Sequence, residues 1–307
     1  MTGGVLRCWG SNQWGQLGLA VADSRTGLST VRTGRETGHV RLHRPATQLS
    51  TFTSHTCALL SEGRVQCWGS NSNGQLGLGH TNRVGDDELP ISAALVSLDA
   101  TGSPDHAVAV SVACGHIHSC ALLASGAVRC WGSNADGQLG LRHTNTIGDD
   151  ELPSTVPPIS LGGAASSISC GRAHSCAVMH EDGAVRCWGL NSEGQLGLAH
   201  IFTIGDDEHP SDAAPVQLGG LAQRVACGAA FTCALMQSGA VRCWGRNVDG
   251  NLGLSRTDRI GDNEHPSSLP PVALGQPVIA LDCGNHHTCA VLLDGSVRCW
   301  GANTAGQ

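Results

Sequence analysis

The sequence predicts an all-β fold of the β-propeller type, built from about six similar four-stranded sheets. Three observations lead to this prediction: one motif recurs along the whole chain, short apolar runs alternate with turn residues, and no stretch shows sustained helical periodicity. A sheet of this size cannot bury its faces alone, so neighbouring units must stack against one another. We therefore expect a single repeat domain over residues 1–307.

A Trp-Gly dipeptide marks every repeat. The dipeptides begin at Trp9, Trp68, Trp131, Trp188, Trp244 and Trp300, at intervals of 59, 63, 57, 56 and 56 residues. Each lies in a phrase such as "AVRCWGSN", and "GQLGL" and "GDDELP" or close variants follow in most units. The expected units are 1–50, 51–113, 114–169, 170–226, 227–282 and 283–307. The first and the last of these units are partial.

Two apolar runs in each unit predict a β-hairpin. The runs "CALL" and "AVRCW" flank short segments such as "SEG" and "ASG" that end in Gly. Loops of about three residues with Gly connect antiparallel strands. The phrase "GDDE-x-P" is typical of a turn, because Asp and Gly tolerate unusual backbone angles and Pro interrupts strand pairing.

Ten of the fifteen cysteines occur in these hairpins as five sets. A three-residue turn places the two members of a set opposite each other, with Cβ atoms about 4.5–5.5 Å apart. A disulfide prefers about 3.8 Å, so bonding requires local tightening. Disulfides would indicate an extracellular or periplasmic protein, and the alternative, buried free thiols, a cytoplasmic one. The sets are Cys57 with Cys67, Cys120 with Cys130, Cys176 with Cys187, Cys233 with Cys243, and Cys289 with Cys299.

Zinc and calcium are the metals that the motifs raise as alternatives. "CGHIHSC" brings Cys, His and Cys together, as zinc ligands would be. Phe231, however, replaces the histidine that other units carry at His118, His174 and His287. The "GDDE" carboxylates could ligate calcium, but Asp also stabilises turns through its own hydrogen bonds. We predict no metal site and no cofactor.

The combined motif "GxVxCWGxNxxGQLGLG" followed by "CGxxHxCAL" resembles the repeats of the regulator of chromosome condensation family over nearly the whole chain. The resemblance implies a β-propeller with one four-stranded blade per repeat and commonly seven blades. The chain would then be an arc of about six blades, or an incomplete seven-bladed ring from a longer protein. It also implies that the Trp residues pack between blades and that the histidine is a structural hydrogen-bonding residue. Tight-bend glycines are expected at Gly77, Gly140, Gly197 and Gly253.

Net charge and apolar run length exclude several function classes. The formal net charge is −7 and no run of 18 apolar residues occurs, so we expect neither nucleic-acid binding nor membrane insertion. No Ser-His-Asp, Cys-His or paired-carboxylate set stands apart from the repeat. The sequence therefore predicts no enzymatic activity.

A monomeric, non-catalytic protein-binding scaffold is the predicted function, because loops on repeat scaffolds carry recognition. The most variable loops are 20–50 and 97–110. Candidate binding residues in them are Arg35, Arg41, Asp99, Asp105 and His106. Two alternatives stay open. One is guanine nucleotide exchange on a small GTPase, which rests on family analogy alone, and the other is a secreted ligand- or inhibitor-type binder.

Overall fold

The computed structural model describes residues 6–20, 39–99, 107–304 and 306. The chain divides into two compact units. The first comprises Met1–Ala124, Arg129–Ser133 and Thr146–Pro158, and the second comprises Ser125–Val128, Asn134–Asn145 and Ile159–Gln307. Over the part of the chain that is described, no helix has the length and apolar character needed to cross a membrane.

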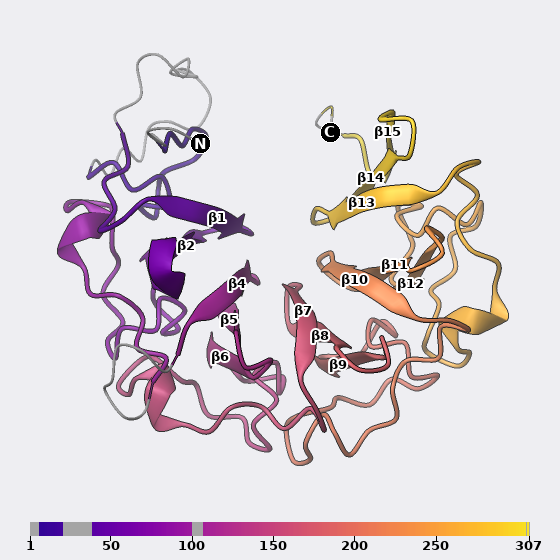
Figure 1. Cartoon of the computed structure of the whole chain (residues 1–307), viewed down its shortest axis with the longest axis horizontal. Coiled ribbons are helices and arrows are strands. Elements are labelled where there is room, and N and C mark those ends of the chain that lie inside the picture. The colour runs from indigo at the N-terminus through magenta and orange to yellow at the C-terminus, as the bar shows by residue number, and fades with distance from the viewer. Residues whose placement is uncertain (1–5, 21–38, 100–106, 305, 307) are drawn as a thin grey trace. The chain divides into compact units, whose positions relative to one another are not determined.

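Both units are built from three-stranded antiparallel sheets in which the strands follow one another in chain order (Figure 1). The first unit holds β1 (Ala46–Thr51), β2 (His55–Leu60) and β3 (Val65–Gly69) in one sheet. Its other sheet is β4 (Ala109–Cys114), β5 (His118–Leu123) and β6 (Val128–Gly132), whose Val128 belongs to the second unit.

The second unit repeats this arrangement in three further sheets (Figure 1). The first is β7 (Ala165–Cys170), β8 (His174–Met179) and β9 (Val185–Gly189). The next is β10 (Ala222–Cys227), β11 (Phe231–Met236) and β12 (Val241–Gly245), followed by β13 (Val278–Cys283), β14 (His287–Leu292) and β15 (Val297–Gly301).

The predicted hairpin connects the second and third strands of each sheet. In the first sheet a short 3-10 turn, η1 (Ser61–Gly63), makes the connection, and Glu62 and Gly63 adopt positive φ angles of 67° and 71°. The middle strand β2 is buried along its whole length, since its residues pack on both faces. Its sequence, "HTCALL", therefore lacks the alternation of apolar and polar residues that is typical of a half-exposed strand.

Among the described residues the expected fourth strand does not form, and this corrects the prediction of four-stranded blades. Its place is taken by single bridges, such as Gly69 with Val84 and Gly189 with Ile204. A 3-10 turn follows in three repeats: η2 (Pro90–Ser92), η3 (Pro153–Thr155) and η4 (Pro266–Ser268). The segment after the third strand is also held by side chains of that strand, which donate to its backbone carbonyls. Arg186, for example, donates to the carbonyls of Pro210 and Ala213.

The first repeat also departs from expectation. Among the described residues around Trp9, β-pairing is limited to one bridge between Leu6 and Val40. The Trp9 side chain is 67% exposed. The segment predicted as a loop over 20–50 overlaps β1 from Ala46 onward, and the segment 97–110 runs into β4 at Ala109.

Candidate functional site

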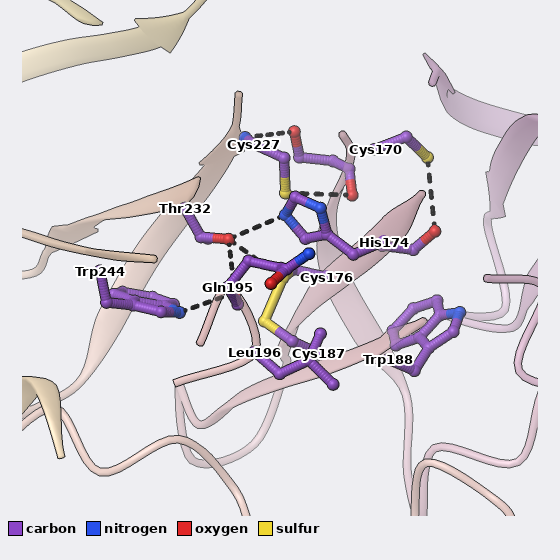
Figure 2. The surroundings of a disulfide bond; sticks show 12 residues. Cys170, His174, Cys176, Cys187, Trp188, Gln195, Leu196, Cys227, Thr232 and Trp244 are labelled. Carbon is purple, nitrogen blue, oxygen red and sulfur yellow. Dashed lines mark hydrogen bonds between the residues drawn. A yellow bond between two sulfur atoms is a disulfide. The ribbon is translucent and has the colours of Figure 1, made fainter. Parts of the chain in front are cut away.

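The backbone carbonyl of the Gln in "GQLGL" accepts hydrogen bonds from side chains of the next repeat. In the second unit, the carbonyl oxygen of Gln195 accepts hydrogen bonds from Trp244 Nε1 and from Thr232 Oγ1, both at 2.9 Å (Figure 2). The same pair of bonds reaches Gln75 O from Ser119 and Trp131 within the first unit. The Trp of the motif therefore packs on the preceding repeat and also donates to it.

The motif glycines let this contact form. A Cβ atom on Gly197, whose φ is +72°, would lie 2.7 Å from Trp244 Nε1. Gly77, Gly140 and Gly253 face Trp131, Trp188 and Trp300 in the same way. Trp68, Trp131, Trp188 and Trp244 are fully buried, and Trp300 is half-buried. The exposed Trp9 is the exception to the predicted packing role.

All five hairpin sets of cysteines form disulfides, one in each three-stranded sheet. Each bond joins the middle strand of a sheet to its third strand. The bonds are Cys57 to Cys67, Cys120 to Cys130, Cys176 to Cys187, Cys233 to Cys243, and Cys289 to Cys299.

The strand register explains the pairing in the first sheet. The Leu60 N–H donates to Arg64 O, and hydrogen-bonded pairs alternate along the ladder with pairs that are not hydrogen-bonded. Cys57 and Cys67 are thus a non-hydrogen-bonded pair, the closer kind. Their Cα atoms are 4.1 Å apart, shorter than the roughly 4.5 Å usual for such pairs. The local tightening expected from the sequence is present.

The histidine that begins the middle strand bonds to the next sheet. His174 Nε2 lies 3.0 Å from Thr232 Oγ1. Since the Thr232 hydroxyl already donates its hydrogen to Gln195 O, it accepts from a protonated Nε2. Burial lowers the pKa of His174 to about 3, so the ring is neutral. In the first unit His55 makes the same bond to Ser119 Oγ at 2.8 Å, and its pKa is likewise lowered to about 3 by burial and then by His116.

The first strand of four sheets ends in a cysteine outside the disulfides, and some of these thiols bond to the neighbouring sheet. Cys227 Sγ donates to the carbonyl oxygen of Ser169 on β7, and Cys114 Sγ donates to Ser50 O on β1. Burial raises the pKa of each thiol to about 12. The thiolate, which is the reactive form, is therefore suppressed, and these cysteines are poor nucleophiles despite their closeness to a disulfide.

Ligand atoms of His174, Cys176 and Cys227 all lie within 4.8 Å of one another (Figure 2). This cluster differs from the set that the sequence raised for zinc, because Cys227 of the next repeat stands in place of Cys170. In this cluster Cys176 is bonded to Cys187, so its sulfur offers no thiolate. Nε2 of His174 is engaged by Thr232, and the Cys227 thiol resists deprotonation. The arrangement supplies cross-linking and hydrogen bonding between sheets, and its chemistry does not favour metal ligation in the disulfide form.

The acidic phrase closes a turn against the preceding repeat. In the first such turn, the backbone N–H of Gly85 donates to Glu88 Oε1. A Cβ on Gly85 would meet the carbonyl oxygen of Gly15 at 2.5 Å, so the two loops are in direct contact. The pKa of Glu88 is raised by burial, with contributions from Asp87 and Asp86. These contacts give the phrase a structural role beside its exposed carboxylates.

Two of the five candidate binding residues, Arg41 and Asp99, lie in the described part of the chain. Arg35, Asp105 and His106 lie outside the described residues. Arg41 is exposed. Asp99 is half-buried, and its charge acts on Arg129: burial lowers the pKa of the Arg129 guanidinium and Asp99 counteracts that shift.

Sequence reasoning missed the Asn of "CWGxN". The side chain of Asn71 is fully buried: its Oδ1 accepts from the Leu76 N–H, and its Nδ2 donates to the carbonyls of His80 and Asn82. It thereby shapes the "GQLGL" loop and the segment after it. The recurrence of Asn after Trp-Gly in all six phrases was the available signal.

The repeat motif, the three-stranded sheets and the inter-repeat bonds can now be compared with known proteins. A family model described as an RCC1-like domain matches residues 2–307. The chain belongs to the RCC1-like domain family. Human HERC6, a probable E3 ubiquitin-protein ligase, is 33% identical over 98% of this chain. The E3 ubiquitin-protein ligase HERC2 of human is 30% identical over 99%, and the ultraviolet-B receptor UVR8 of Arabidopsis thaliana 29% over 97%.

The chain is short compared with these relatives, since the matches span 26% of HERC6, 6% of HERC2 and 61% of UVR8. Solved structures share the fold. Human WBSCR16 has a TM-score of 0.73 and 23% identity, covering 95% of this chain and 72% of that one. Yeast RCC1 (Prp20) bound to Kap60 has a TM-score of 0.71 and 21% identity, covering 96% and 65%.

Proposed function

We propose that this RCC1-like chain is a non-catalytic protein-binding scaffold that recognises partners through the loops between its repeats. One observation carries the proposal: the repeated polar groups are engaged inside the scaffold, whereas the loop tips are exposed and one of them is apolar where the others are polar. Gln carbonyls, histidines and thiols bond to the adjacent sheet. Loops carry specificity on rigid scaffolds of this kind.

The loop tips that follow "GQLGL" or "GNLGL" show this difference between repeats. Equivalent positions hold Thr81–Asn82, Thr144–Asn145, Ile201–Phe202 and Thr257–Asp258, and all eight side chains are exposed. Relatives support the same use of the fold: one solved structure is of yeast RCC1 bound to Kap60, and another addresses the binding of Prp20p to Gsp1p and histones. Exchange on a GTPase rests on that analogy alone.

The five disulfides favour an oxidising location for this scaffold. They support the second candidate function, a secreted or periplasmic ligand- or inhibitor-type binder. A thiol count on protein isolated without reductant from its own cells tests the second candidate, the secreted or periplasmic binder. Five titratable thiols would support the oxidising location, and fifteen would remove that support.

The scaffold proposal is tested by cross-linking in the source cells, comparing the wild-type chain with a tip variant. The variant replaces all eight tip residues by Ser, which leaves the backbone acceptors of the loops in place. We expect discrete proteins that cross-link to the wild type and are lost with the tip variant. Equal cross-linking of both chains to the same proteins would reject loop recognition, and no cross-linked protein at all would reject the scaffold.

A further inference from the structure

One loop tip breaks the repeat symmetry with apolar side chains. Ile201 and Phe202 are 54% and 73% exposed, where the equivalent positions of the other repeats are polar, as in Thr144–Asn145. Single exposed apolar residues are ordinary on protein surfaces, but an adjacent pair next to a hollow is typical of an interaction site.

A cavity of about 320 Å³ opens beside this tip, within the second unit. Its apolar wall includes Leu198, Ile204 and Ala213. His200 joins the cavity to the tip, because it lines the cavity and its ring centroid lies 5.4 Å from that of Phe202. Burial lowers the pKa of His200, so this ring is neutral at pH 7.

The cavity has a local cause in the sequence. Ala213 stands where two other repeats carry the larger Val156 and Leu269. The Ala213 backbone is held in place, since its carbonyl accepts a hydrogen bond from Arg186 Nη1 at 2.6 Å. The wall is therefore a fixed part of the scaffold. A third repeat has Ala93 at the equivalent position, so the small side chain is shared by two of the four repeats.

Two carboxyl groups, Glu208 and Asp212, line the same cavity, and none of its described lining residues is an arginine. Asp212 is specific to this repeat, because Ser92, Thr155 and Ser268 occupy its position elsewhere. The nearby guanidinium of Arg142 donates to the backbone carbonyl of Asp207, outside the cavity lining. The combination of an apolar hollow, an apolar rim and acidic groups is complementary to a ligand that is both apolar and basic.

We infer that this cavity is a docking site for a basic peptide segment. An aliphatic side chain of the peptide enters the hollow, Ile201 and Phe202 cover it, and an adjacent Lys or Arg pairs with Asp212 and Glu208. The inference rests on the proposed scaffold function and specifies where and what the scaffold binds.

The test uses the folded chain to select from a phage-displayed random heptapeptide library at low ionic strength. The best enriched peptide is then synthesised and titrated by isothermal calorimetry against the wild type and two variants, I201T/F202N and Asp212→Ser. Both variants introduce residues that other repeats carry at the same positions, so the fold has a precedent for each. Near-ultraviolet circular dichroism of the variants checks that they are folded.

We expect peptides that combine a Lys or Arg with an aliphatic residue, and binding at least tenfold weaker for I201T/F202N. Asp212→Ser should weaken binding and reduce its salt dependence, because one ionic contact is lost. Transferring the tip alone in T144I/N145F should create no second site. No enrichment, enriched peptides without basic residues, or equal affinity for the variants would overturn the inference. Partners that still cross-link through other loops would leave the scaffold function standing.

Discussion

Replacement of His174 by Phe should make the protein more resistant to acid. The histidine is fully buried and its pKa is about 3 in the folded chain, against about 6.5 when unfolded. Between these two values the unfolded chain binds one more proton than the folded chain. The free energy of unfolding therefore falls as the pH decreases below 6.5, and the histidine is neutral in both states above it.

The magnitude follows from the pKa difference. Each pH unit below the unfolded pKa costs about 1.4 kcal/mol until the folded pKa is reached, so one such histidine removes about 2 kcal/mol at pH 5. The half-buried glutamates act in the opposite direction, because partial burial raises the pKa of Glu208 in the folded chain. They are common to both proteins, so their effect cancels when the variant is compared with the wild type.

The assay is urea denaturation followed by Trp fluorescence at pH 7.5 and pH 5.0 and constant ionic strength. His174→Phe should show about 2 kcal/mol less change between the two pH values than the wild type, whatever its stability at pH 7.5. The repeat with Phe231 shows that Phe fits this position. The reciprocal variant Phe231→His should gain the same pH sensitivity. Identical pH dependence in all three proteins would refute a neutral buried histidine.

Three further predictions concern the scaffold. Gly197→Ala should cost about 1 to 3 kcal/mol more than Gly275→Ala in unfolding free energy, because both have positive φ but only Gly197 abuts Trp244; equal costs would contradict the close contact. Removing the Cys176–Cys187 disulfide by double Ala substitution should lower the free energy of unfolding by about 3 kcal/mol, the value expected from the length of the loop that the bond closes. Thermal unfolding measures this loss. Ellman titration of unreduced, denatured protein should count five thiols, the cysteines that are free in the structure.

The hairpins and the cysteine pairing could be predicted from the sequence because both are local. Turn length and strand alternation alone place Cys57 opposite Cys67, and the longer turn of one repeat accounts for Cys176 and Cys187. The family and its repeat architecture were also readable, since the phrases around Trp68 and its equivalents are specific.

The strand count and the site could not be read in the same way. The segment after the third strand pairs through single bridges such as Gly189 with Ile204, and Arg186 binds the carbonyl of Pro210, 24 residues further along the chain. No periodicity in the sequence indicates either feature. The cavity near Ala213 depends on how side chains such as Leu198 and Ile204 pack around it, and the sequence alone does not give that packing. The charge of Asp99 acts on the buried Arg129, which the sequence could not indicate.

The disulfides join residues only 10 or 11 positions apart, and every one stays inside a single sheet. Across the described part of the chain, no covalent bridge passes from one repeat to its neighbour. A whole repeat can therefore be added by duplication or removed by deletion without breaking a disulfide of another repeat. Under mechanical tension, successive repeats can separate while the disulfide of each hairpin holds its two strands together, so the segments that connect the repeats would extend first.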